Sequence, residues 1–260
     1  MDQEIIFTRK EKDGRSFAEI TLNRPQKGNA LTLPMLDAFE SAVKTVAADS
    51  SLRALVLRGN GRFFCTGGDI EAWGSLSPDE MARGWILRGI EVIERLAALP
   101  QPVVAVITGH ALGGGLELAL AADLRIAVQS AKFGMPEVGL GMIAGWGGVR
   151  KLAETIGVAR ARHMTLVGSA IEARQALEWG LVTSLADDAA SLEVQLQALL
   201  DRLLANAPLA MRETKAILAT MNLDLRQQHA AAVATVAATA DCQEGVRAFR
   251  EKRRPTFHNR

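Results

Sequence analysis

The residues best placed to do chemistry lie in the segment His110–Asp123, which reads HALGGGLELALAAD. Its three consecutive glycines keep side chains away from the start of a predicted helix, so the unpaired N–H groups there are open to an anion or a polarised carbonyl. Glu117 follows Gly114 by three residues and lies about one turn along the same helix face. A carboxylate beside an oxyanion pocket is the arrangement of an acid/base site. Close helix–strand packing, with a glutamate favoured by the helix dipole, explains the same motif without catalysis.

A second glycine-containing segment, Phe63–Ile70 (FFCTGGDI), has the same plan of a strand, glycines and then a charged residue. The strand expected before the first motif is the apolar, β-branched run Val103–Ile107, bounded by Pro102 and Gly109. Two loops of the same plan make a paired site more plausible than either loop alone.

The remaining pattern predicts the framework that positions these loops. Alternation around Asp13-Gly14 predicts a hairpin of Ile5–Thr8 and Phe17–Leu22, and further strands are expected at Leu52–Leu57 and Leu124–Val128. Helices are expected after an N-cap at Thr32, and at Asp79–Leu99, Arg150–Ile156, Ala159–Leu166 and Ala173–Trp179, with a glycine-rich loop over 133–148. Strands alternating with helices indicate an α/β fold.

From about Leu192 the pattern is almost entirely helical, with helices opening at Pro208 and over 229–240. We therefore expect a core over residues 1–191 and a helical appendage over 192–260.

Composition excludes several classes of function. The 260 residues are 48% hydrophobic and carry a net charge of +1, which gives no electrostatic footprint for nucleic acid. Two cysteines, Cys65 and Cys242, predict no disulfide framework, and no ligand spacing predicts a metal. The N-terminus lacks a signal-peptide pattern and no apolar run reaches membrane-spanning length, so a cytoplasmic protein without membrane contact is expected. Nucleotide-binding glycine motifs are absent as well.

Taken together, Phe63–Asp69, Gly109–Asp123 and Pro136–Arg150 resemble the crotonase superfamily, and enoyl-CoA hydratases most closely. The resemblance extends from Leu22–Pro25 to Glu244-Gly245 and Phe249–Arg253. It implies a spiral of ββα repeats over 1–191 and a helical trimerisation region over 192–260. It also implies a homotrimer or a hexamer built as a dimer of trimers, and an acyl-CoA substrate with no tightly bound cofactor.

By resemblance, the N–H groups of Gly68 and Gly114 form an oxyanion hole for a thioester enolate. Glu117 would activate water and Glu137, in Met135-Pro136-Glu137, would protonate Cα. Read alone, Glu137 is better explained as an N-cap or first-turn residue of a helix after Pro136. The residues expected to bind substrate or coenzyme A are Arg24, Gln26, Lys27, Thr66, Gly67, Asp69, Ile70, Gly145, Trp146 and Lys252. The resemblance allows Lys252 to act across a subunit boundary.

Three positions depart from the common hydratase pattern. Glu71 stands where a lysine often meets coenzyme A phosphates, Ala144 replaces a frequent proline, and Trp146 replaces a small residue. Trp146 either narrows the acyl pocket or packs beneath the loop. The expected activity is hydration of a 2-enoyl-CoA to a 3-hydroxyacyl-CoA. The alternatives are an enoyl-CoA isomerase that uses mainly one carboxylate, and a non-catalytic acyl-CoA-binding protein.

Overall fold

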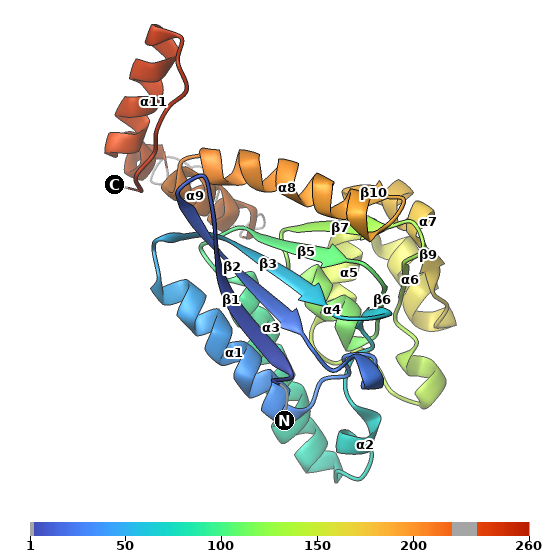
Figure 1. Cartoon of the computed structure of the whole chain (residues 1–260). Helices are drawn as coiled ribbons and strands as arrows, with labels where there is room; N and C mark the ends of the chain where they lie inside the picture. Colours follow the sequence, from blue (N-terminus) through green and yellow to red (C-terminus); the bar gives the residue numbers. More distant parts are fainter. Residues whose placement is uncertain (1–2, 220–232, 260) are drawn as a thin grey trace.

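The computed structural model describes residues 3–219 and 233–259. Over these residues two sheets form the framework (Figure 1). The larger has the order β1-β2-β3-β5-β7-β10, and the smaller has the order β4-β6-β8-β9. The strands of the larger sheet are β1 (Ile5–Lys12), β2 (Arg15–Leu22), β3 (Leu52–Gly59), β5 (Val103–Ile107), β7 (Leu124–Val128) and β10 (Ser184–Ala186). Those of the smaller sheet are β4 (Phe63–Cys65), β6 (His110–Leu112), β8 (Lys132–Gly134) and β9 (Ile171–Glu172).

Three successive units give the molecule its plan. In each unit a strand of the larger sheet turns into a strand of the smaller one, as β3 into β4, β5 into β6 and β7 into β8, and helical segments follow. Within each sheet these strands pair in parallel. This arrangement is the ββα spiral expected from the resemblance.

The hairpin prediction is confirmed by β1 and β2, which pair antiparallel. Asp13 and Gly14 both have positive φ, at 51° and 71°, as a two-residue hairpin turn requires. Thr32 caps the next helix as predicted, because its side chain accepts a hydrogen bond from the Met35 N–H at 3.3 Å.

The helices cover the sheets on several sides. Among them, α1 contacts β1, β2 and α3, whereas α8 contacts β3, β7 and β10. The α-helices are α1 (Leu33–Ala48), α2 (Ile70–Trp73), α3 (Leu87–Ala97), α4 (Gly114–Leu120), α5 (Gly148–Ile156), α6 (Val158–Val167), α7 (Ala173–Glu178), α8 (Ala189–Ala205), α9 (Pro208–Ala219) and α11 (Ala240–Glu251). Two 3-10 segments, η1 (Pro25–Lys27) and η3 (Glu137–Leu140), and the π-helical segment η2 (Glu80–Ile86) complete the described set.

Two local predictions need correction. The glycine turn does not follow Val103–Ile107 directly, because the short strand β6 lies between that strand and α4. The helix expected over Asp79–Leu99 begins as π-helix and becomes regular only at Leu87.

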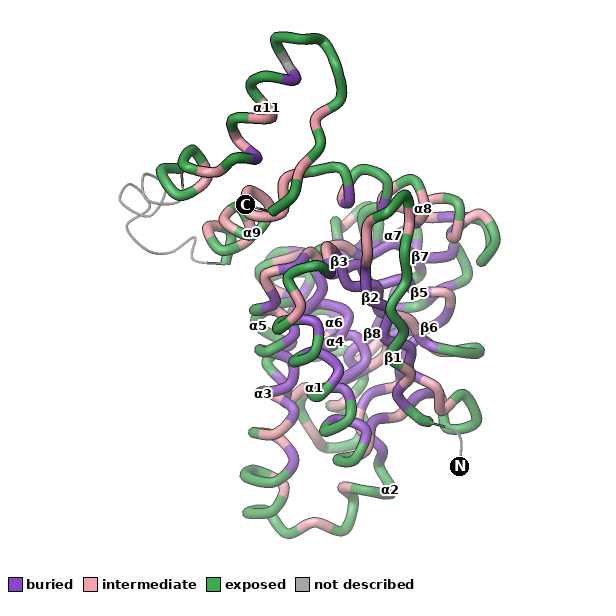
Figure 2. The backbone as a smooth tube through the Cα atoms, turned by 60° about the vertical axis from the view of Figure 1, so that its left-hand side comes forward, coloured by how far each residue is buried: buried purple, intermediate pink, exposed green. Residues whose placement is uncertain are grey.

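In the C-terminal region, the expected boundary at residue 191 falls within α8, whose buried leucines pack into the core. The helix expected to open at Pro208 is α9. The start of the one expected over 229–240 lies outside the described residues. Figure 2 shows buried backbone concentrated in the sheets and α4, and mostly exposed backbone in α11.

Candidate active site

Glu117 lies in the most buried helix of the site, α4, whose seven residues are all buried. Glu117 is only 2% exposed. Its Oε1 atom accepts hydrogen bonds from the backbone N–H groups of Trp146 at 2.8 Å and Gly148 at 2.7 Å. Burial and the nearby charge of Glu137 raise the pKa of Glu117 to about 7, against the opposing effect of these two donors. The carboxyl group is therefore held in place while keeping a proton affinity suited to proton transfer near neutral pH.

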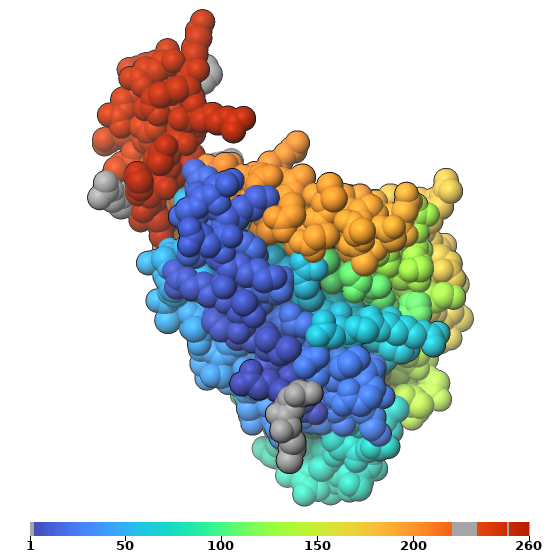
Figure 3. Space-filling view, in the orientation of Figure 1, coloured from blue at the N-terminus to red at the C-terminus, as the bar shows by residue number. Residues whose placement is uncertain are grey.

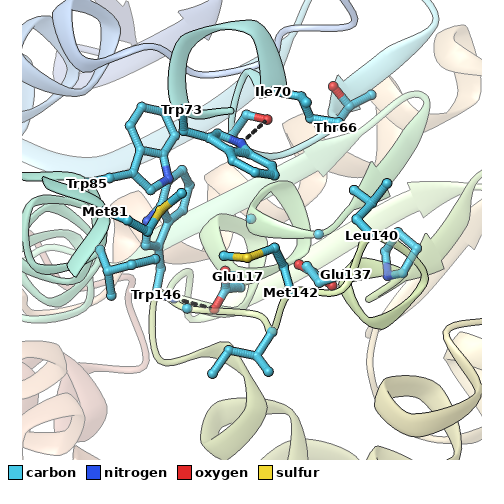
Figure 4. A pocket seen from close by; sticks show the side chains of 17 residues that line it. Thr66, Ile70, Trp73, Met81, Trp85, Glu117, Glu137, Leu140, Met142 and Trp146 are labelled. Carbon is cyan, nitrogen blue, oxygen red and sulfur yellow. Dashed lines mark hydrogen bonds between the residues drawn. The ribbon is translucent and has the colours of Figure 1, made fainter. Parts of the chain in front are cut away.

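Glu137 is the first residue of η3, directly after Pro136, and thus has the local position that the sequence alone also predicts. Its carboxyl group nevertheless faces the same cavity as Glu117 (Figure 4). Burial raises the pKa of Glu137, and its buried Oε2 atom has no hydrogen-bond partner among the described residues. An unpartnered buried carboxyl oxygen is costly unless a ligand or a proton meets it.

The N–H of Gly68 is oriented by a single parallel bridge to Leu31. The Leu31 N–H donates to the Gly67 carbonyl and the Leu31 carbonyl accepts from the Asp69 N–H, both at 2.8 Å. Because alternate peptide groups of an extended chain point to opposite sides, the N–H of Gly68 points away from Leu31. On that side the Trp73 indole N–H donates to the Gly68 carbonyl at 3.3 Å.

The N–H of Gly114 is left without an intrahelical partner because Gly114 opens α4. Gly114 and Gly68 line one cavity, and no described residue accepts a hydrogen bond from either N–H. The two glycine loops are brought together by the parallel pairing of β4 with β6. Gly67 has φ of +99°, and a Cβ there would lie 2.8 Å from the Gly114 nitrogen, so only glycine fits this approach.

The cavity has a volume of about 600 Å³ including its open mouth. Apart from the two glutamates, its lining consists of glycines, Thr66 and apolar residues, most of them large: Ile70, Trp73, Met81, Trp85, Ile86, Pro136, Leu140, Met142, Ile143 and Trp146. Low polarity around the two carboxyl groups accounts for the direction of both pKa shifts.

Several residues expected to bind substrate do line this cavity, namely Thr66, Ile70, Gly145 and Trp146. Gly67 lies behind the two N–H groups, in contact with Gly114. Trp146 was expected either to narrow the pocket or to pack beneath its loop. Its side chain borders the cavity, and the residue is also packed to 3% exposure. Ala144 is partly buried against the core.

The charged residues of the loop over residues 24–29 form ion pairs with acidic residues that follow Gly68. Arg24 forms an ion pair with Asp69 and donates to the Ala30 carbonyl at 3.1 Å. Lys27 pairs with Glu71 at 2.9 Å on the surface, so Glu71 has a cation as its neighbour. Gln26 is exposed in η1.

Lys252 directly follows α11, and Figure 1 shows α11 at the opposite end of the molecule from α2, which carries the cavity residues Ile70 and Trp73. One chain therefore does not bring Lys252 to the other predicted site residues.

Sequence reasoning missed Asn29, which is fully buried with a positive φ of 56°. Its side-chain amide donates to the carbonyls of Asn60, Phe63 and Phe64 at 2.8 to 3.2 Å, and its oxygen accepts from the Arg24 N–H. Asn29 therefore fastens the loop over residues 24–29 to β4 and to the turn before it, just ahead of the stretch that contains Gly68. Its neighbour Gly28, also at positive φ, was the available signal.

Trp73 and Trp85 were missed as well, because they lie in short or irregular helices. No group of three potential metal ligands occurs within residues 3–219 and 233–259, and no helix in that part of the chain has the length and apolarity needed to cross a membrane.

Comparison with known proteins gives consistent matches along the chain. The family described as enoyl-CoA hydratase/isomerase matches residues 12–260. A putative enoyl-CoA hydratase/isomerase of Bacillus subtilis is 39% identical, covering 99% of this chain and 99% of the relative. A crotonyl-CoA hydratase of Syntrophomonas wolfei is 35% identical, with 98% of each chain covered. The crystal structure of an enoyl-CoA hydratase from Bacillus anthracis superimposes with a TM-score of 0.93 at 33% identity, covering 99% of this chain and 100% of the other.

Proposed function

Because the chain belongs to the enoyl-CoA hydratase/isomerase family, we propose that it adds water across the α,β double bond of a 2-enoyl-CoA to give a 3-hydroxyacyl-CoA. The observation that carries this proposal is the meeting of two carboxyl groups and two unpaired N–H donors in one apolar cavity. Hydration needs both kinds of group, because charge develops on the thioester oxygen while one proton leaves water and another is delivered to Cα.

In the proposed reaction, Glu117 takes a proton from water as the water oxygen bonds to Cβ. The electrons of the double bond move to the thioester carbonyl oxygen, which Gly68 and Gly114 stabilise through their N–H groups. Glu137 then gives a proton to Cα as the carbonyl re-forms. Glu117 takes up one proton from water and Glu137 releases one to Cα. The two glutamates regain their starting protonation states when a proton passes from Glu117 to Glu137.

The two glutamates differ in ways that suit these roles. Glu117 accepts two backbone hydrogen bonds, which favour its charged, base form. Burial raises the pKa of both carboxyl groups, so each can hold a proton near neutral pH. Glu137 differs in that its buried Oε2 atom has no hydrogen-bond partner among the described residues, which suits the protonated form that an acid needs. The apolar cavity keeps other water molecules from competing for the enolate.

Coenzyme A enters this proposal only as part of the substrate, without a further cofactor. Thr66 and Ile70 line the cavity, and the same loop contains Asp69, which pairs with Arg24 beside the exposed Gln26 and Lys27. We propose that this loop, with Gly67, faces the coenzyme. We further propose that Lys252 reaches coenzyme A from a neighbouring subunit of a trimer or a dimer of trimers, and that the protein acts in the cytoplasm.

The test is the loss of enoyl absorbance on hydration of crotonyl-CoA by wild-type protein, Glu117→Gln and Glu137→Gln. We expect each variant to lose about 100-fold to 10,000-fold in kcat, the usual contribution of one positioned acid or base. Double-bond isomerisation that depends on Glu137 but survives Glu117→Gln identifies an isomerase instead. Binding of crotonyl-CoA without any turnover identifies a non-catalytic protein.

A further inference from the structure

Tryptophan is concentrated at the candidate site. The chain has four tryptophans and no tyrosine, and three of the four, Trp73, Trp85 and Trp146, line the one cavity. They come from three different segments, α2, η2 and the loop before α5. Aromatic residues make up only 5% of the chain, yet three of its four tryptophans line this cavity.

Two of the rings lie against the proposed oxyanion donors. Trp85 Cζ2 lies 2.6 Å from the position that a Cβ on Gly68 would take, and Trp146 Cζ3 lies 2.6 Å from that of Gly114. The two rings therefore lie directly beside the two residues whose N–H groups are proposed to meet the thioester carbonyl, in the same cavity.

The ring of Trp146 is fixed by a glycine in the middle of a helix. Gly89 lies within α3, and a Cβ at Gly89 would overlap the Trp146 pyrrole ring. Glycine is an unfavourable helix residue, so its presence here is best explained by the room it leaves for the indole. Trp85 and Trp146 are each 3% exposed and pack with ring centroids 5.9 Å apart, which leaves no space for an alkyl chain between them.

The two ends of the cavity differ. In Figure 4 the labelled side chains Trp85, Met81 and Trp146 lie on one side of the glutamates, and Thr66 and Leu140 lie on the other. Since Thr66 lies on the coenzyme side in the proposed function, the acyl group points towards the indoles. Among the described residues, no charged side chain other than Glu117 and Glu137 lines the cavity, so the acyl group is uncharged.

Resting on the proposed function, we propose that the preferred substrate carries an aromatic ring at Cβ, as in a 3-aryl-2-enoyl-CoA, and that Trp146 with Trp85 determines this preference. The parts of the packed indole rings that border the cavity favour a flat ring through edge contacts beyond simple burial. The sulfur atoms of Met81 and Met142, which border the same space, add favourable contacts with a ring. A long straight chain meets the closed Trp85–Trp146 pair and is disfavoured.

The test compares kcat/KM for three racemic 3-hydroxyacyl-CoA thioesters in the dehydration direction, followed by the appearance of enoyl absorbance. The acyl groups are 3-hydroxy-3-phenylpropanoyl, 3-hydroxybutanoyl and 3-hydroxydecanoyl. The protein variants are wild type, Trp146→Leu and Trp85→Leu. Trp179→Leu is the matched control, because Trp179 packs against His163 and Arg160 outside the cavity. Both cavity variants keep the backbone N–H groups that hold Glu117.

We expect wild type and Trp179→Leu to prefer the phenyl substrate. We expect Trp146→Leu to lower the phenyl-to-butanoyl ratio about tenfold and to raise the relative rate of the decanoyl substrate, since ring contacts are lost and space is opened. A wild-type preference for butanoyl or decanoyl, or a ratio unchanged in both cavity variants, overturns the inference while the hydratase function stands. Absence of turnover with every substrate overturns the function itself.

If the cavity variants do not fold, the wild-type protein alone still tests the preference for an aromatic acyl group. Calorimetric binding of the unreactive 3-phenylpropanoyl-, butanoyl- and decanoyl-CoA reports the acyl pocket directly, because the coenzyme is the same in all three. Tightest binding of the phenyl compound supports the inference, and any other order contradicts it.

Discussion

At the scale of single residues, two opposing effects set the pKa of the Glu117 carboxyl group. Burial disfavours the charge of Glu117, and two backbone N–H groups favour it. Burial has the larger effect, so the folded protein binds a proton at Glu117 more tightly than the unfolded chain does. Both the stability and the activity of the protein therefore depend on pH through this residue.

Replacement of Glu117 by glutamine is expected to stabilise the protein above neutral pH. Stability due to the raised pKa of Glu117 is fully present below about 4.5 and is lost as pH rises through about 7, which amounts to about 3 kcal/mol. Glutamine is neutral throughout and its carbonyl still accepts the two N–H groups. Denaturant unfolding of both proteins at pH 4 and pH 8 measures the effect. A difference between variant and wild type that does not grow with pH contradicts this account.

The same pKa predicts the pH dependence of hydration. In the base role proposed for it, Glu117 has to be deprotonated, so kcat/KM is expected to fall about tenfold per pH unit below pH 7. The measurement is kcat/KM for crotonyl-CoA between pH 5 and pH 8, with unfolding followed in parallel to exclude acid denaturation. A profile that is flat down to pH 5 assigns the base role to another group.

The residue types of this site were predictable from sequence, but their environment was not. Glu117 and the three glycines before it lie in one short motif that is recognisable in the sequence. The N–H groups that hold Glu117 come from residues 29 and 31 positions further along, so no local pattern contains them. Glu137 carries no local signal of catalysis at all, and only the resemblance to a family singled it out.

At the scale of elements, the two N–H donors come together because β4 and β6 pair directly before the two glycine loops. The strands themselves were hard to predict, since β4 and β6 have only three residues each, too few for a periodic pattern. Pairing over so short a length positions the loops only if the loops also pack closely. Gly67 against Gly114 provides that packing.

Alanine at Gly67 is expected to remove activity more than stability. Its Cβ would press on the Gly114 nitrogen from 2.8 Å, and its φ of +99° is strained for any other residue. Displacing one donor costs about 100-fold to 1000-fold in kcat in comparable sites. Crotonyl-CoA kinetics and circular dichroism of Gly67→Ala test this expectation.

Gly245→Ala is the matched control, because Gly245 lies in α11 with only ordinary contacts and no positive φ. Kinetics of Gly67→Ala that equal those of wild type would show that the close approach is not needed for catalysis.

At the scale of the whole molecule, α11 stands apart from the body of the chain, as Figure 3 shows. The segment that follows α11 contacts the body, where Arg53 donates to the Phe257 carbonyl at 3.3 Å and Asn259 donates to the Ser50 carbonyl at 3.4 Å. Val246 within α11 is exposed, and so is Val233, which precedes α11 in the chain. A projecting helix with exposed apolar side chains is better explained by contact with another copy of the chain than by stability of one chain alone.

Self-association through this region is therefore the expected outcome in solution. Light scattering coupled to size exclusion is expected to give three or six times the chain mass of 27.9 kDa. Truncation before Ala240 is expected to lower that number. A monomer of the full chain contradicts both the assembly and the proposed reach of Lys252 into a neighbouring site.

The single bridge between Leu31 and Gly68 also limits how the loop can change in length. Peptide groups in this extended stretch alternate in direction, so the count of residues from Cys65 to Asp69 decides which N–H points into the cavity. One inserted or deleted residue reverses that direction, however conservative its chemistry, whereas the side chain of Thr66 is free of this constraint. Loop grafting or recombination at this site consequently has to preserve residue number before residue identity.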